Sequence, residues 1–164
     1  MVRKLLLGLA FLSASAQAME PVSVDEVRFA TASLTVATAE GETGYTPAEL
    51  ESFGTYAIRT VTPWRETAAE FVGVLLAEVL DAHGLAEAAA IRVVAENDYA
   101  VTIPSTVWTE HDLLIATRVD GKAHNRRARG PIQFIFDMSK DPGTGDEEFQ
   151  SNWVWMAARI EPVE

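Results

Sequence analysis

The positive charges of this chain gather in one short segment. Lys122, His124, Arg126, Arg127 and Arg129 lie close together in a chain that has 13 Lys and Arg against 24 Asp and Glu. Arginine guanidinium groups form paired, charge-assisted hydrogen bonds with phosphate and carboxylate groups. The segment therefore indicates a site for a small anion. The alternative is a solvated hairpin rim, where charges block the pairing of a sheet edge.

Other patterns that carry chemistry are missing from the sequence. It contains no cysteine, which removes thiol nucleophiles, disulfides and thiolate metal sites. His83, His111 and His124 lack the spacing of a metal site, and the acidic segment 137–148 departs from the calcium-loop pattern. No phosphate-binding glycine loop or hydrolase motif occurs. We therefore expect no metal and no catalytic residue, and the formal net charge of −11 makes us expect no nucleic-acid partner.

Residues 1–18 have the order of a secretory signal peptide. A positive start, Arg3 and Lys4, precedes an apolar run over 5–12 and a small-x-small cleavage site over 16–18. The apolar run is too short to span a bilayer. A buried N-terminal strand or helix is the alternative. We expect a periplasmic or secreted protein with no membrane span after cleavage.

The remaining chain, 19–164, is expected to form one α+β domain with mixed sheets and short helices. The expected strands cover 33–38, 55–61, 91–95, 99–103, 113–119, 132–136 and 154–160, the last with a helix as the alternative. A capping box over Thr46–Glu49 predicts a short helix that ends near Gly54, and 40–44 has the composition of a turn. Apolar spacing predicts a helix over 71–83. Because strands outnumber helices without a regular alternation, the sheets should be mixed.

Several segments, read in order, carry a family resemblance. They are Trp64, 71–76 with Val79-Leu80 and Gly84, 93–104 with Asn97-Asp98-Tyr99, 113–116, Asp120-Gly121-Lys122, Gly130-Pro131-Ile132, and 155–160. Together they resemble the sulfite-oxidase-like molybdopterin-binding domain, and its small exported members known as molybdopterin-dependent oxidoreductases. The match covers about residues 55–161. It implies a mixed α+β fold, with the stretches around Thr60 and 97–99 near the cofactor site.

The departure from this family concerns the metal ligand. Its catalytic members bind molybdenum through a cysteine in an Arg-Cys-x-x-x-Trp arrangement. The similar stretch here reads Arg59-Thr60-Val61-Thr62-Pro63-Trp64, so Thr60 stands in place of the cysteine. A neutral hydroxyl is a poor donor to a metal that prefers thiolate. The family's Gly-x-Pro-x-Arg strand also reads Gly130-Pro131-Ile132-Gln133, so its arginine is absent unless Arg126, Arg127 or Arg129 replaces it.

Three functions remain open at this point. The first is an exported, non-catalytic binding, sensory or accessory module without a cofactor, whose partner is a small anionic ligand or an exported or membrane-anchored protein. The second is a molybdopterin-dependent oxidoreductase that holds its cofactor without a cysteine ligand. The third is a structural protein that presents Trp153 and Trp155 to a partner. For the first we expect a cleft lined by Thr60, Trp64, Asn97 and Tyr99, with Arg126, Arg127 and Arg129 at its rim.

Overall fold

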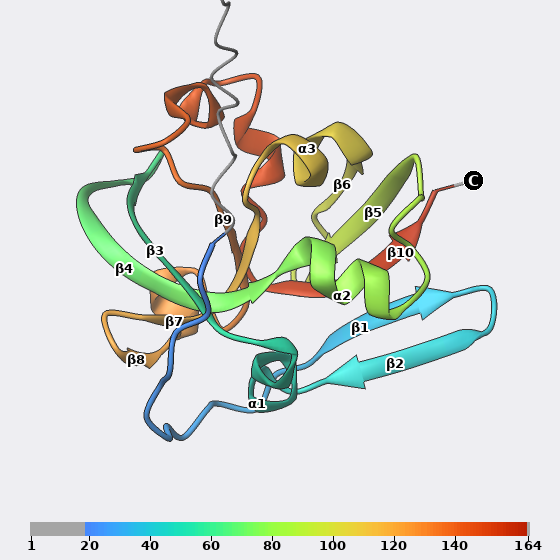
Figure 1. Ribbon diagram of the computed structural model, residues 1–164, viewed down its shortest axis with the longest axis horizontal. Helices are drawn as coiled ribbons and strands as arrows, with labels where there is room; N and C mark the ends of the chain where they lie inside the picture. The colour runs from blue at the N-terminus through green and yellow to red at the C-terminus, as the bar shows by residue number, and fades with distance from the viewer. Residues whose placement is uncertain (1–18, 164) are drawn as a thin grey trace, which may run out of the picture.

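The computed structural model describes residues 19–163, which form two five-stranded sheets and several short helices (Figure 1). The strands are β1 (Leu34–Thr38), β2 (Gly41–Tyr45), β3 (Tyr56–Thr62), β4 (Arg65–Leu75), β5 (Ala90–Ala95), β6 (Ala100–Pro104), β7 (Leu114–Val119), β8 (Lys122–Ala123), β9 (Gln133–Ile135) and β10 (Ala157–Pro162). The helices are α1 (Pro47–Leu50), α2 (Leu76–Ala82) and α3 (Ser105–Glu110), with single 3₁₀ turns η1 (Glu51–Phe53), η2 (Arg126–Ala128), η3 (Pro142–Gly145) and η4 (Gln150–Asn152). The signal peptide expected over 1–18 lies outside the described residues.

The two sheets divide the strands into two groups. The first sheet has the order β2-β1-β10-β5-β6, and within it β1 pairs with β10 in parallel while the other pairs are antiparallel. The second has the order β3-β4-β7-β8, and β9 also pairs with β7. This mixture of strand directions, with few and short helices, confirms the α+β fold class that the sequence predicts.

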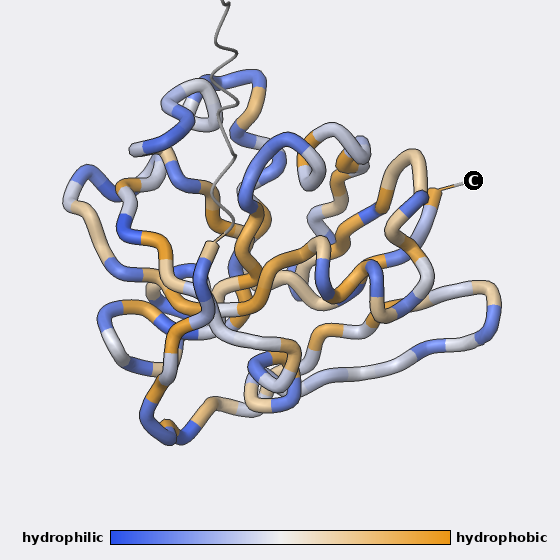
Figure 2. The backbone as a smooth tube through the Cα atoms, in the orientation of Figure 1, coloured by the Kyte–Doolittle hydropathy of each residue, from blue (hydrophilic) through white to orange (hydrophobic). Residues whose placement is uncertain are grey.

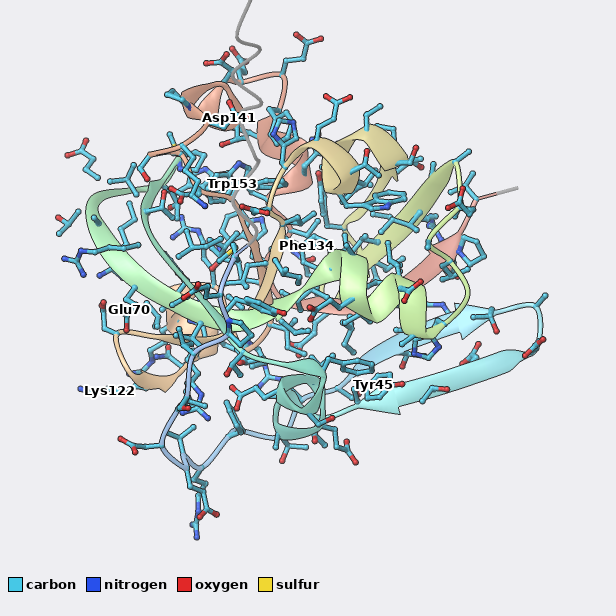
Figure 3. All side chains as sticks on the ribbon, in the orientation of Figure 1. Tyr45, Glu70, Lys122, Phe134, Asp141 and Trp153 are labelled. Carbon is cyan, nitrogen blue, oxygen red and sulfur yellow. The ribbon has the colours of Figure 1, made fainter. Side chains whose placement is uncertain are left out.

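Apolar segments of both sheets meet in the middle of the molecule, as the hydropathy colouring of Figure 2 shows. Phe134 and Trp153 lie in this central region, whereas Glu70 and Lys122 lie at the periphery (Figure 3). The indole Nε1–H of the buried Trp153 donates to the carbonyl oxygen of Thr144 at 2.7 Å. Trp153 therefore packs in the core, and the only polar atom of its side chain has a hydrogen-bond partner.

Most of the local elements that the sequence predicts are confirmed. The strands expected between 33 and 136 are all present, with ends that differ by at most one residue. The capping box is complete, because the Thr46 side chain accepts from the Glu49 N–H and the Glu49 carboxylate accepts from the Thr46 N–H at 2.8 Å. The short helix then tightens into η1 and ends at Gly54.

The prediction of a helix over 71–83 is wrong for the first part of that range. Residues 71–75 belong to β4, and α2 begins only at Leu76. Four consecutive buried residues, 71–74, run between β3 and β7. A continuous apolar run suits a strand covered on both faces as well as a helix, so its periodicity does not distinguish the two.

Two further expectations need correction. Residues 41–45 form β2 rather than a turn, because their backbone pairs along the whole of β1 although their side chains are mostly exposed. The closing strand begins at Ala157 rather than at Val154, and the positive φ of 53° at Met156 breaks the extended chain before it. Trp153 and Trp155 therefore do not share one strand face.

Candidate anion-binding site

Arg129 stacks against two tryptophans that come from distant parts of the chain. Trp64 lies in the turn between β3 and β4, and Trp155 lies between η4 and β10. The guanidinium carbon of Arg129 is 4.5 Å from the Trp155 ring centroid and 5.4 Å from that of Trp64. The two indoles stack with centroids 5.1 Å apart and planes 20° apart. Cation–π contacts therefore fix where this arginine lies.

The backbone conformation and contacts of residues 125–130 support this placement of Arg129. The Asn125 side chain caps η2, and Arg129 follows with a φ of 75°, in the left-handed region that non-glycine residues rarely adopt. Gly130 then packs directly on the His124 ring. A Cβ added to Gly130 would lie only 2.6 Å from the Cγ of His124, which leaves no room for a side chain at this position. The N–H of Met156 donates to the Arg129 carbonyl oxygen at 3.2 Å. These contacts join the basic segment to the chain just before β10.

A cavity of about 310 Å³ lies beside Arg129, and we call it the Arg129 pocket. Its lining residues are Thr62, Trp64, Arg65, Phe71, His124, Ala128, Arg129 and Gln133. Two of these residues are arginines, and none of the described lining residues carries a carboxylate. Three other pockets of the described chain each carry carboxylates in their lining, in keeping with the acidic composition. The Arg129 pocket is therefore a positive region on an acidic protein.

Two buried nitrogens, each on a residue that lines the Arg129 pocket, have no hydrogen-bond partner within residues 19–163. They are Nε of Arg129 and Nδ1 of His124. The other ring nitrogen of His124 lies 2.8 Å from Oε1 of Gln133. Burial lowers the pKa of His124 below its ordinary value, and the positive charge of Arg65 lowers it further, against the hydrogen bond with Gln133. Buried polar atoms are rarely left unpaired, so these two nitrogens mark the pocket as a candidate binding site.

A second pocket of about 310 Å³ shares Trp64 with the Arg129 pocket, and we call it the aromatic pocket. It is lined by Trp64, Asn97, Tyr99, Gln150, Ser151, Trp153 and Trp155. The Tyr99 hydroxyl donates to the Ser151 carbonyl oxygen at 3.2 Å, and the Asn97 side-chain oxygen accepts from the Tyr99 N–H at 3.3 Å. The structure thus brings Trp64, Asn97 and Tyr99 together.

Thr60 is placed differently from these three residues. It lies within β3 with 2% of its surface exposed, and it lines neither the aromatic pocket nor the Arg129 pocket. Its hydroxyl donates to the Val61 carbonyl oxygen at 3.0 Å and accepts from the Met138 N–H at 3.0 Å. The bond with Met138 joins β3 to the segment that follows β9, whereas the bond with Val61 stays within β3.

The three arginines expected at the rim differ in their surroundings. Arg126 makes two hydrogen bonds of 2.8 Å with the Glu96 carboxylate, and these bonds raise the pKa of its guanidinium. Arg127 is exposed and makes no side-chain hydrogen bond or ion pair within 19–163. Arg129 alone among the three lines the pocket. Arg65 of β4 and Gln133 of β9 line the same pocket, and no local sequence signal identifies these two residues as neighbours of Arg129.

The residues present do not fit molybdenum held by a protein thiolate. The chain contains no cysteine, and the Thr60 hydroxyl, which stands in place of that ligand by resemblance, already accepts from the Met138 N–H and donates to the Val61 carbonyl oxygen. Within 19–163, no three His, Asp or Glu side chains are arranged to hold a metal ion. In the same range, no helix is both long and apolar enough to cross a membrane.

Comparison with known proteins supports the fold and no more. No protein-family model and no curated protein matches the chain. Among solved structures, the sulfane dehydrogenase SoxCD from Paracoccus pantotrophus is similar, with 14% sequence identity and a TM-score of 0.57. The match covers 80% of this chain and only 38% of that one. This likeness confirms the expected sulfite-oxidase-like, mixed α+β fold.

Proposed function

We propose that this protein is a non-catalytic binding module that takes a small oxyanion in the Arg129 pocket. The observation that carries the proposal is that Arg65 and Arg129 both line one cavity whose lining contains no carboxylate. The chain as a whole has a formal net charge of −11, so this cavity differs from the rest of the protein in its charge. A cleft of one sign concentrates ligands of the opposite sign. Guanidinium groups suit oxyanions because their N–H donors match the spacing of two oxygens.

The two arginines contribute unequally to this pocket. Arg65 donates to Asp120 at 3.2 Å and to the Thr67 carbonyl oxygen at 3.0 Å, so part of its charge is already compensated. Arg129 makes no ion pair with any described residue, and aromatic stacking holds its guanidinium. Arg129 is therefore the residue on which anion affinity should depend most.

A binding role without redox chemistry agrees with the side chains present. Thiolate ligation is impossible for a chain without cysteine, and the Thr60 hydroxyl already makes hydrogen bonds with the backbone of Val61 and Met138. If residues 1–18 act as a signal peptide, the module works in the periplasm or outside the cell. A small anion is the ligand that the pocket favours, and an exported or membrane-anchored partner would then respond to its occupancy.

The test compares the binding of simple anions by wild-type protein and by arginine variants. Calorimetric titration with phosphate, sulfate and acetate should show binding that weakens about tenfold or more in Arg129→Gln, because a charge-assisted contact contributes roughly 1.5–3 kcal/mol. Arg126→Ala and Arg127→Ala are the matched controls. They should change affinity less than about twofold, since exposed or already paired charges contribute little.

Two results would contradict the proposal. One is the absence of binding for all of the anions by folded wild-type protein. The other is an Arg129→Gln variant that keeps its native circular dichroism and binds as well as wild type.

A further inference from the structure

The two unpartnered nitrogens of the Arg129 pocket have opposite hydrogen-bonding roles. The Nε–H of Arg129 can only donate. Nε2 of His124 lies 2.8 Å from Oε1 of the Gln133 amide, an oxygen that can only accept, and we therefore assign the ring hydrogen to Nε2. Nδ1 of the neutral ring is then an acceptor. A ligand that satisfies both nitrogens must offer one acceptor and one donor.

We propose that the pocket selects a tetrahedral oxyanion that still carries a proton, of the hydrogen phosphate type, over a fully deprotonated one such as sulfate. This inference rests on the proposed function. The O–H of hydrogen phosphate would donate to Nδ1 of His124, while a bare oxygen would accept from Nε–H of Arg129. Sulfate has the same shape and charge as the hydrogen phosphate dianion, but it would set an oxygen lone pair against that of Nδ1.

The surroundings of His124 keep the ring in this acceptor state. The charged groups that face it are Arg65 from β4 and Arg129 after η2, both positive. Phe71 packs edge-on with its ring centroid 6.1 Å away, and Gln133 of β9 is neutral. A positively charged imidazole would donate from both nitrogens and could therefore bind sulfate. Burial of the ring and the positive charge of Arg65 oppose that charged form.

Ligand contact requires a shift of side chains, since neighbours cover both nitrogens. Stacking on the two tryptophans positions the guanidinium of Arg129, but no side-chain hydrogen bond ties it to any described residue, so it can shift more readily than a hydrogen-bonded group. His124 is held more firmly, by Gln133 on one side and by the backbone of Gly130 on the other. Of the two groups, the acceptor is therefore the more firmly held.

Matched anions provide the test on wild-type protein. At mildly alkaline pH, phosphate is mainly the hydrogen phosphate dianion, whereas sulfate and monofluorophosphate are dianions without a proton. We expect phosphate to bind at least about tenfold more tightly than sulfate or monofluorophosphate. With either of these two anions bound, Nδ1 of His124 would remain a buried acceptor without a donor. Equal or tighter binding of sulfate would overturn the selectivity while leaving the anion site intact. Failure of all three anions to bind would overturn the proposed function itself.

The tautomer of His124 offers a second test that needs no variant. Nitrogen NMR of wild-type protein should show an unprotonated Nδ1 and a protonated Nε2, and the reverse assignment would overturn the inference. In Gln133→Glu the new carboxylate should hold His124 doubly protonated, so that Nδ1 donates and the preference turns toward sulfate. A folded Gln133→Glu variant with a doubly protonated ring and an unchanged preference for phosphate would also overturn it.

Discussion

The Gly73→Ala variant is expected to lose at least about 3 kcal/mol of the free energy of unfolding, more than a typical substitution. A Cβ on Gly73 would lie 2.0 Å from the carbonyl oxygen of Ile115 and 2.6 Å from the Cα of Ala116. Both atoms belong to the backbone of β7, which pairs with β4 at this point. Backbone atoms cannot rotate away as a side chain would, so the two central strands of the second sheet must separate. Denaturant unfolding followed by circular dichroism measures the loss.

Gly44→Ala is the matched control for this prediction. Gly44 also lies in a strand, β2, but no heavy atom lies within 4 Å of the place that an added Cβ would take, and its φ is not positive. The same chemical change should therefore alter stability by less than about 1 kcal/mol. Similar losses in both variants would show that close strand contact is not the reason for the glycine at 73.

Removal of the Glu51 carboxylate is expected to destabilise the protein by about 3–5 kcal/mol, because it leaves a buried arginine unpaired. The Arg118 side chain is 5% exposed, and its Nε and Nη2 donate to Glu51 at 2.8 and 2.6 Å. The Thr117 hydroxyl donates to the same carboxylate at 2.6 Å, and Nη1 of Arg118 donates to the Asp25 carbonyl oxygen at 2.5 Å. The hydrogen bonds with Glu51 raise the pKa of Arg118, so the arginine stays charged. Glu51→Ala, measured by thermal and denaturant unfolding, tests this directly.

Two controls separate the unpaired charge from simple loss of packing. Lys140→Ala breaks an exposed pair with Asp112 at 3.3 Å and should cost less than about 1 kcal/mol. The double variant Glu51→Leu with Arg118→Met replaces the buried pair by apolar side chains. It should recover much of the stability that Glu51→Ala loses. A double variant no more stable than Glu51→Ala would contradict the explanation.

Features that depend on neighbouring residues could be predicted from the amino-acid sequence. The Thr46–Glu49 capping box is correct because its donors and acceptors lie within one turn of chain. The strand at 114–119 and its return past Asp120-Gly121 follow from an apolar run and a turn-forming pair. The absence of cysteine is likewise a property of the composition, and it removes thiolate chemistry whatever the fold.

Which of these residues meet depends on the packing of the whole chain. The run 71–75 is a strand because β3 and β7 pair with it along its two edges, and both of these partners come from other parts of the chain. Arg126 and Arg129 are the same residue type three positions apart, yet Glu96 compensates one while Trp64 and Trp155 hold the other beside a pocket. Thr60 binds the Met138 N–H rather than facing a cleft. Each outcome depends on strand register and long-range contacts, which bring distant residues within a few ångströms and which no local pattern encodes.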